Sequence, residues 1–457
     1  MSTAKQIDVI VIGAGPAGEV CAGRLAEGGR RVAIVERDLI GGECSFYACM
    51  PSKAFLRPAE VLDETRRVQG AAQALAGGLD VQAVLDRRDE IIHGLDDSGQ
   101  LPWLEKRSIR LIRGRGELVG ERRVKVGETL IEAGEAVILA PGSVAALPPI
   151  PGLAEARPWT NREATTARAI PESLLILGGG VVGVEMASAY ASLGAAVTVV
   201  EALPRLIAGE EEFASKLVEE GLEGRGVTVI TGVKAVSVSR ETPGGPVEVA
   251  LEDGVSLRAA EMLVATGRRP LSDGLGLESV GVEGGGYIEV DDTLRVPGRD
   301  WLYAIGDVNG RALLTHMGKQ QARQVADRIL GKRSPSAPAG QVIPRVIFTE
   351  PQVAAVGETL ESALKAGVKA SARQISLQAN AGASFVGHDA GGCAQIVIDE
   401  DRGVMIGACF VGVEVAESLH AATVAIVAQV PLELLAQAVP CFPTRSEAWL
   451  GLLVDFS

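Results

Sequence analysis

The chain has 457 residues, more than one hydrophobic core can serve, so we expect roughly two to four domains. Apolar residues make up 47% and charged residues 22%, the balance of an ordinary globular protein. The net charge of −14 argues against nucleic acid or an anionic membrane surface as a partner, and no apolar run is long enough to span a membrane. Because the sequence does not start with a basic region and a cleavage site, we expect a cytoplasmic protein.

A nucleotide-binding pattern opens the chain. The apolar run from Ile7 to Ile12 predicts a buried parallel strand, and a glycine-rich turn then leads into a helix through Leu25. A second strand, from Val32 to Val35, ends in Glu36. The glycines allow backbone N–H groups to approach a pyrophosphate, and the acid binds ribose hydroxyls. The stretch therefore predicts a dinucleotide site that contains Gly13, Gly15, Gly18 and Glu36.

Two cysteines, Cys44 and Cys49, follow this pattern and come just before Pro51-Ser52-Lys53. We expect their spacing to place both sulfurs on one turn of helix, within bonding reach. The chain has only six cysteines (positions 21, 44, 49, 393, 409 and 441), which is sparse for a secreted disulfide scaffold, so the close pair suggests redox chemistry. A metal site is less favoured, because there is no second cysteine pair and only four histidines.

The nucleotide-binding pattern recurs in the middle of the chain. A strand from Leu174 to Leu177 leads into Gly178, Gly180 and Gly183, and a strand from Val197 to Val200 ends in Glu201. Each copy is followed by another strand with a small-residue turn, at 137–142 and at 262–267. This duplication predicts two dinucleotide sites. Two such sites on either side of a dithiol imply electron transfer between two cofactors.

The second copy interrupts the first. After Gly267 the chain returns to a strand ending in Gly306-Asp307, and a helix follows from Thr315. The proline-containing segment 331–340 predicts a linker, and the remainder alternates strands (394–398, 404–411) with helical runs such as 417–428. We therefore predict an α/β protein with two Rossmann-like dinucleotide-binding domains and a C-terminal α+β dimerisation domain. The first domain spans 1–148 and 268–335, the inserted domain 149–267, and the C-terminal domain 341–457.

Taken together, the motifs resemble the flavoprotein disulfide reductases, the family of dihydrolipoamide dehydrogenase, glutathione reductase and mercuric reductase. The resemblance covers nearly the whole chain. Beyond the two glycine loops and the cysteine pair, it rests on Ala265-Thr266-Gly267, Ala304-Ile305-Gly306-Asp307, and Pro443-Thr444 with Ser446-Glu447. It implies an FAD-binding domain, an inserted NAD(P)-binding domain and an interface domain. It also implies a homodimer in which each active site draws residues from both chains.

The resemblance further implies catalytic roles. Cys49 is expected against the flavin, and Cys44 as the outer sulfur that meets the acceptor. Lys53 is expected near flavin N5, paired with Glu185, because a cation there stabilises the anionic reduced flavin. Electrons would pass from NADH to the flavin, then to the Cys44–Cys49 disulfide and finally to a small-molecule acceptor.

FAD and NADH are the implied cofactors. FAD is expected to contact Glu36 through its adenosine ribose and Asp307 through its ribityl chain. A carboxylate at Glu201 bonds ribose hydroxyls and repels a 2′-phosphate, which favours NADH, whereas Arg205 could tolerate a phosphate, so NADPH is the less favoured coenzyme. The remaining predicted cofactor contacts are Lys53 and the glycines of the turns: Gly13, Gly15, Gly18, Gly116, Gly142, Gly178, Gly180, Gly183 and Gly267.

The sequence departs from the family at the expected base. In the disulfide-exchanging members, a histidine precedes the C-terminal Pro-Thr and pairs with the later glutamate. Here Phe442 holds that position and Glu447 remains. Without general-base assistance, which contributes about a hundredfold or more, a thiol of pKa ~8.5 is only a few per cent ionised at neutral pH. The resemblance also implies a cis peptide between Phe442 and Pro443.

Two further aromatic residues, Phe46 and Tyr47, lie between the cysteines. One hypothesis is that they form an apolar pocket over the disulfide together with Phe442. The alternative is aromatic packing at a dimer seam. Among the four histidines, His316 is the best candidate proton donor because it begins the helix after Asp307. We expect His93 in a polar helix of the FAD-binding domain and His420 on an apolar helix, both in structural roles, and His388 in a loop of the C-terminal domain. Cys441 is either a third thiol offered from the partner chain or a packing residue.

Three functions remain open. The first is an FAD-dependent, NADH-driven reductase that reduces a disulfide through Cys44 and Cys49. The second is an NADH:quinone or diaphorase-type reductase, which the aromatic residues favour. The third, a redox-sensing flavoprotein, is the least favoured because the sequence offers no effector domain.

Overall fold

The computed structural model describes residues 7–333 and 342–456. It separates into two compact units. Of the described residues, the first unit comprises 7–51, 89–146 and 268–333, and the second comprises 52–88, 147–267 and 342–456. Residues 52–88, predicted as part of the FAD-binding domain, are thus grouped with the second unit. Most of the predicted linker, residues 334–340, lies outside the described residues.

A parallel sheet forms the centre of the first unit. Its strands are ordered β3, β2, β1, β6 and β16, and the antiparallel pair β5 and β4 continues from β6. Apolar runs such as Val9 to Ile12 are buried. This is typical of parallel strands, because the helices that connect them cover both faces of the sheet. The bounds are β1 Ile7–Ile12, β2 Val32–Glu36, β3 Arg110–Arg113, β4 Gly116–Leu118, β5 Arg123–Val126, β6 Thr129–Leu139 and β16 Leu302–Ala304.

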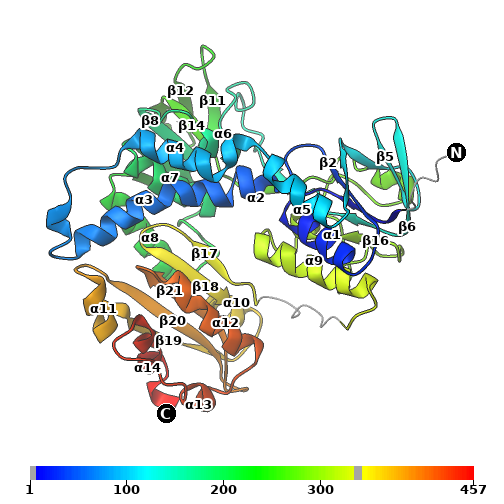
Figure 1. Ribbon diagram of the computed structural model, residues 1–457. Helices are drawn as coiled ribbons and strands as arrows, with labels where there is room; N and C mark the ends of the chain where they lie inside the picture. The colour runs from blue at the N-terminus through cyan, green and yellow to red at the C-terminus, as the bar shows by residue number, and fades with distance from the viewer. Residues whose placement is uncertain (1–6, 334–341, 457) are drawn as a thin grey trace. The chain divides into compact units, whose positions relative to one another are not determined.

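Two long helices pack together in this unit. Helices α1 (Pro16–Glu27) and α9 (Thr315–Ile329) lie side by side in Figure 1. Both begin just after a strand of the sheet, α1 after β1 and α9 after β16 and a short 3-10 turn, η5 (Gly306–Asn309). The unit also contains α2 (Gly42–Phe46), α5 (Leu101–Lys106) and the small antiparallel pair β7 (Ser143–Ala145) and β15 (Arg268–Pro270).

The second unit contains a second parallel sheet, with strand order β10, β9, β8 and β14, followed by a three-stranded antiparallel sheet, β11 to β13. The parallel strands are β8 Ser173–Leu177, β9 Ala196–Glu201, β10 Thr228–Thr231 and β14 Glu261–Val264, and the antiparallel ones are β11 Ala235–Ser239, β12 Val247–Leu251 and β13 Ser256–Ala259. The helices are α3 Cys49–Arg67 (which begins in the first unit), α4 Val81–Ile91 (which ends in the first unit), α6 Asn161–Thr166, α7 Val181–Ser192 and α8 Glu212–Gly224.

The C-terminal part of the second unit is a five-stranded antiparallel sheet. Its order is β17, β18, β21, β20 and β19, with α12 packed on β18 and β21, and α14 on β19 and β20. The strands are β17 Arg345–Ile347, β18 Gln352–Gly357, β19 Ala370–Ser376, β20 Gly392–Asp399 and β21 Val404–Gly412. The helices are α10 Leu360–Lys365, α11 Ala381–Val386, α12 Leu419–Val427, α13 Leu432–Leu435 and α14 Ala448–Leu452. Two parallel sheets and this antiparallel one confirm the predicted α/β fold class.

Some local predictions were wrong. The helix predicted from Glu417 starts at Leu419, because a 3-10 turn (Ala416–Ser418) precedes it. His93, which we expected in a helix, opens a 3-10 turn (His93–Leu95) with a φ of 52°. No helix among the described residues is both long and apolar enough to cross a bilayer.

Candidate functional site

The cysteine pair lies at a break between two helices. Cys44 belongs to α2, which ends at Phe46, and Cys49 begins α3. The prediction of a single helical turn was therefore wrong, since Tyr47 and Ala48 separate the two helices. Both cysteines are partly exposed, and Cys49 Sγ lies 3.5 Å from the Thr315 hydroxyl oxygen at the start of α9.

The surroundings of Cys44 disfavour its ionisation. A hydrogen bond with Cys49, burial, and the charge of Cys49 raise the pKa of Cys44. A hydrogen bond with Thr315 and the positive charge of Lys319 act in the opposite direction and lower it. The two sulfurs are thus within hydrogen-bonding reach, and both of these opposing effects come from residues of α9.

The two aromatic residues between the cysteines differ in burial. Phe46 is only 2% exposed, and its ring packs beside the ring of Tyr47 and against Gly41. The hypothesis that Phe46 lines an acceptor pocket is therefore wrong, because the side chain belongs to the interior of the first unit. Tyr47 remains partly exposed.

A polar chain connects Asp307 to the helix of Cys44. The Ser143 hydroxyl donates to Asp307 Oδ2 at 2.5 Å and accepts from Arg268 Nε at 2.7 Å. Arg268 Nη2 lies 3.7 Å from the carboxylate of Glu43, the neighbour of Cys44. Sequence analysis missed Ser143 and Arg268. Each follows the glycine of a predicted turn, Gly142 or Gly267, and that position was the available signal.

The predicted acid, Glu36, is hydrogen-bonded to the backbone of the first glycine loop. Glu36 Oε2 accepts from the backbone N–H of Ala14 at 2.6 Å, and its Oε1 accepts from that of Asp38 at 2.7 Å. Gly13 has a φ of 104°, and a β-carbon there would lie 2.1 Å from the carbonyl oxygen of Ala140, so only glycine fits. At Gly15, by contrast, a β-carbon would meet nothing, so the loop is open there.

A pocket in the first unit adjoins this loop. It is lined by Ile12, Gly13, Val35, Glu36, Arg37, Gly114, Arg115, Gly116, Pro141, Leu271, Asp273 and Leu275. Glycine backbone, the carboxylates of Glu36 and Asp273, and apolar walls fit the adenosine half of a dinucleotide. The pocket contains the predicted contact Gly116, and Gly142 has a φ of 78° in the turn just after Pro141.

The second glycine loop repeats this geometry within the second unit. Glu201 Oε2 accepts from Gly179 N–H at 2.6 Å, and its Oε1 accepts from Leu203 N–H at 2.7 Å. Gly178 has a φ of 108°, and a β-carbon there would lie 2.5 Å from the carbonyl oxygen of Ala265. A β-carbon added at Gly180 or Gly267 would contact no atom, whereas one added at Gly183 would lie 1.9 Å from the carbonyl oxygen of Gly178. The two copies therefore use the same hydrogen bonds at equivalent positions.

The Arg205 guanidinium is hydrogen-bonded to neighbouring groups of the second unit. Its Nη1 donates to the Ser215 hydroxyl and its Nη2 to the Ala208 carbonyl oxygen, each at 2.8 Å. These bonds tie the guanidinium to its own loop and to α8.

The predicted Lys53–Glu185 pair is formed in the second unit. Lys53 Nζ lies 2.7 Å from Glu185 Oε2 and 4.6 Å from the centre of the Phe348 ring. Glu185 is buried on α7, and its other carboxylate oxygen accepts from Phe348 N–H at 3.0 Å. Because Lys53 is on α3, one helical turn beyond Cys49, the helix carries both a thiol and a paired ammonium group.

The C-terminal motif is formed without its histidine. The peptide between Phe442 and Pro443 is cis, as predicted, and the Phe442 side chain is 77% exposed. Glu447 Oε2 accepts from Gly382 N–H in α11 at 3.2 Å. Cys441 is exposed, and its carbonyl oxygen accepts from the Thr444 hydroxyl at 2.6 Å.

The histidines are dispersed over the chain. His316 is the second residue of α9 and is exposed, but the residue that contacts Cys49 is its neighbour Thr315. His420 is exposed on α12. His388 lines a different cleft in the second unit, where α3, α7 and α8 end.

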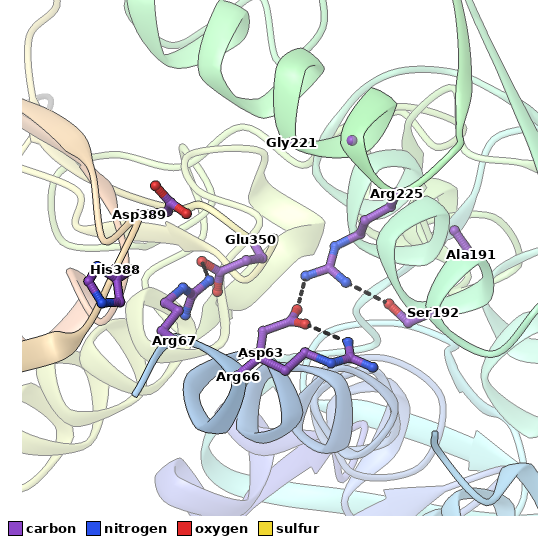
Figure 2. Close-up of a pocket in the computed structure, with 11 residues that line it drawn as sticks. Asp63, Arg66, Arg67, Ala191, Ser192, Gly221, Arg225, Glu350, His388 and Asp389 are labelled. Carbon is purple, nitrogen blue, oxygen red and sulfur yellow. Dashed lines mark hydrogen bonds and ion pairs between the residues drawn. The ribbon is translucent and has the colours of Figure 1, made fainter. Parts of the chain in front are cut away.

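Figure 2 shows this cleft and the charged side chains around it. The cleft encloses about 870 Å³. Asp63 pairs with Arg66 at 3.2 Å and with Arg225, and Arg67 Nη2 donates to Glu350 Oε1 at 2.6 Å. Burial raises the pKa of Glu350, and the charge of Arg67 opposes this effect. These paired charges join the ends of α3 and α8 to the segment before β18.

Both parts of the chain match the models of known families. Residues 7–322 match the family described as Pyridine nucleotide-disulphide oxidoreductase, and residues 343–452 match the dimerisation domain of the same family. The arrangement of two glycine loops, a close cysteine pair and a C-terminal α+β domain is that of a flavin-dependent oxidoreductase.

Individual proteins match along their whole length. A dihydrolipoyl dehydrogenase of Chlorobaculum tepidum is 34% identical, over 97% of this chain and 96% of its own. Among solved structures, the HOCl-induced flavoprotein disulfide reductase RclA of Escherichia coli has a TM-score of 0.86 at 26% identity, covering 98% of this chain and 99% of its own. LpdA of Mycobacterium tuberculosis has a TM-score of 0.87 at 28% identity, covering 99% and 100%.

The chain therefore belongs to the pyridine nucleotide-disulphide oxidoreductase family, whose members are flavoprotein enzymes that use FAD and NAD(P).

The Lys53–Glu185 pair predicts a stability effect. Replacing Lys53 with Met leaves a buried carboxylate with one backbone donor, and we expect the free energy of unfolding to fall by about 2–3 kcal/mol. Glu185→Gln should cost less, because the amide oxygen still accepts from Phe348 N–H and the Lys53 ammonium group, whose side chain is 36% exposed, can be hydrated. Urea denaturation measures both, with Lys216→Met, whose side chain is 76% exposed, as the control. A Lys53→Met protein as stable as the wild type would contradict the prediction.

Proposed function

We propose that the chain is an FAD-dependent NADH oxidoreductase that passes an electron pair through the Cys44–Cys49 disulfide to a small acceptor. The observation that carries the proposal is the placement of the two cysteines. They are in sulfur contact at a helix break, in the same unit as a glycine loop closed by Glu36. FAD, when bound, would accept hydride from the nicotinamide and pass on two electrons.

The protein residues complete the electron balance. The Cys44–Cys49 disulfide takes up two electrons and two protons to become a dithiol. NADH supplies the two electrons and one proton as it is oxidised to NAD⁺, and one free proton completes the balance. The Cys44 thiolate then attacks a disulfide acceptor, releases one acceptor thiol, and Cys49 displaces the second thiol as the internal disulfide closes. Lys53, held by Glu185, would place a positive charge beside the reduced flavin, as in the family. Asp307, held by Ser143, would bind the ribityl chain.

The acceptor is the less constrained part of the proposal. No histidine stands before Pro443, so we favour an acceptor whose thiols leave easily, because exchange with such a group needs less base assistance. Direct reduction of a quinone is the second candidate, favoured by the partly exposed Tyr47 next to the dithiol. A Cu(II) complex of RclA has been solved, and Cu(II) therefore joins the acceptors to be tried.

We further infer that the active form is a homodimer. The C-terminal part that matches the dimerisation domain exposes large apolar side chains, among them Leu434 (61%), Phe442 (77%) and Val439 (84%). Apolar groups this exposed are typical of a surface that a partner covers. In such a dimer Phe442 and Glu447 would be supplied to the dithiol of the other chain.

Cys44→Ser separates the two acceptor classes. We expect it to lower NADH-driven disulfide reduction by about a thousandfold or more, since it removes the nucleophile. Quinone reduction should survive if the flavin reduces the quinone directly. Steady-state NADH oxidation with each acceptor measures both, and Cys393→Ser, on β20, is the matched control. If the wild-type protein reduces no compound in a broad disulfide panel, the proposed disulfide reductase activity is rejected.

We assign the preference for NADH over NADPH to Glu201. Each of its oxygens accepts one backbone N–H and retains a lone pair for a ribose hydroxyl, while the bonds of Arg205 keep that cation from a 2′-phosphate. We expect Glu201→Gln to lower the ratio of kcat/KM for NADH over NADPH by about tenfold or more, because the repulsion of the phosphate is lost. Glu212→Gln, on the exposed start of α8, is the control. An unchanged ratio would remove Glu201 from this role.

A further inference from the structure

Phe348 contacts both members of the Lys53–Glu185 pair. Its backbone N–H donates to Glu185 Oε1 at 3.0 Å, and the centre of its ring lies 4.6 Å from Lys53 Nζ. An ammonium group within about 6 Å of a ring centre is attracted to the face of the ring. Because Lys53 Nζ also lies 2.7 Å from Glu185 Oε2, each of the three residues contacts the other two. They come from three segments of the second unit: α3, α7 and the connection between β17 and β18.

The two partners of Glu185 compensate for its burial. The Glu185 side chain is only 4% exposed, and a carboxylate removed from water is costly unless it is paired and hydrogen-bonded. One oxygen is paired with Lys53 and the other accepts from Phe348 N–H. The Lys53 side chain, by contrast, is 36% exposed and carries its charge at the end of a flexible four-carbon chain. Its ammonium group is therefore free to turn toward water unless a second contact restrains it, and the Phe348 ring provides that contact.

The segment that carries Phe348 is fixed against α3, the helix of the lysine. Glu350 Oε1 accepts from Arg67 Nη2 at 2.6 Å, and Figure 2 shows these two side chains together. Gln352 Nε2 donates to Glu60 Oε1 at 2.7 Å. Arg67 and Glu60 both belong to α3, so two further bonds join this helix to the segment just after Phe348. The ring is thus presented to the ammonium group by a supported stretch of backbone.

We propose that Phe348 is a positioning residue of the redox site: its ring holds the Lys53 ammonium group, and its backbone N–H holds the Glu185 carboxylate that pairs with it. The proposal rests on the proposed function, in which Lys53 places a positive charge beside the reduced flavin. Such a charge stabilises the anionic reduced form most when its position is fixed, because the electrostatic energy falls with distance. Phe348 itself transfers neither an electron nor a proton.

Packing is the alternative role for Phe348. The residue also packs against a cluster of buried apolar side chains that includes Phe55 and Ile347. A packing role depends on the apolar volume of the side chain, whereas the proposed role depends on the charge of Lys53 and on the aromatic face. Phe348→Leu keeps an apolar side chain and the backbone N–H but removes the ring. Phe348→Tyr keeps the ring and serves as the conservative variant.

A double-mutant cycle on unfolding separates the two roles. Urea denaturation is measured for the wild type, Phe348→Leu, Lys53→Gln and the double variant. Phe348→Leu raises the equilibrium constant of unfolding, and we expect this factor to be about threefold to tenfold larger with Lys53 than with Lys53→Gln, because the ring attracts only the ammonium group. Phe348→Tyr should behave like the wild type. Phe213→Leu, near the start of α8 and packed against the same cluster, is the control and should show no such dependence on Lys53.

The midpoint potential of the flavin is a readout that packing alone would not move. It is measured on FAD-loaded protein with Cys44→Ser and Cys49→Ser, so that the cysteine pair takes up no electrons, by anaerobic titration against a dye of known potential. We expect Phe348→Leu to lower the equilibrium constant for two-electron reduction about threefold to tenfold, which makes the potential more negative by about 15–30 mV. Lys53→Gln should shift it at least as far in the same direction. Phe348→Tyr and Phe213→Leu should leave it unchanged.

The two measurements keep this proposal apart from the proposed function. The proposal is overturned if Phe348→Leu has the same effect on unfolding with and without Lys53. It is also overturned if Lys53→Gln shifts the flavin potential and Phe348→Leu does not. If neither variant shifts the potential although unfolding shows the expected dependence, Phe348 holds Lys53 but Lys53 does not act on the flavin. That result rejects the role of Lys53 in the proposed function and, with it, the assignment of Phe348 to the redox site.

Discussion

The contact between Cys49 Sγ and the Thr315 hydroxyl at 3.5 Å is the interaction on which the proposed chemistry depends. It fixes the second cysteine against the N-terminus of α9, while the break at Tyr47 and Ala48 brings Cys44 beside it from α2. A single uninterrupted helix would fix the two sulfurs by helical geometry alone. Because the helix is broken, the positions of the two sulfurs depend instead on how the pair packs against α9.

The two nucleotide-binding copies hold their glycine loops in shape with the same hydrogen bonds. A glutamate at the end of the second strand accepts backbone N–H groups from the glycine loop and from its own turn, as Glu36 and Glu201 both do. Each carboxylate thus holds its loop in shape before any ligand binds, which lowers the cost of ordering the loop on binding. The function follows from the difference between the copies, because only the first is followed at once by a cysteine pair.

Sequence patterns predicted what is local or repeated. The strands and helix of each glycine loop, Glu36, Glu201 and the Lys53–Glu185 pairing all followed from motif spacing or family resemblance, and the structure forms the two loops and the ion pair as expected. What escaped prediction depends on contacts between distant segments. Ser143 and Arg268 meet across 125 positions, and Thr315 contacts Cys49 only because α9 returns to the cysteine pair. The burial of Phe46 was also missed, because its environment is set by packing against Gly41 and not by its neighbours in sequence.

The central claim, that Cys49 couples the dithiol electronically to the flavin, is tested most directly by anaerobic NADH titration followed by visible spectroscopy. We predict a long-wavelength charge-transfer band at two-electron reduction. It should persist in Cys44→Ser, where Cys49 still faces the flavin, and disappear in Cys49→Ser. Bleaching of the flavin with no such band in the wild-type protein, and with no gain in alkylatable thiols, would show that electrons do not reach the cysteine pair and would contradict the account.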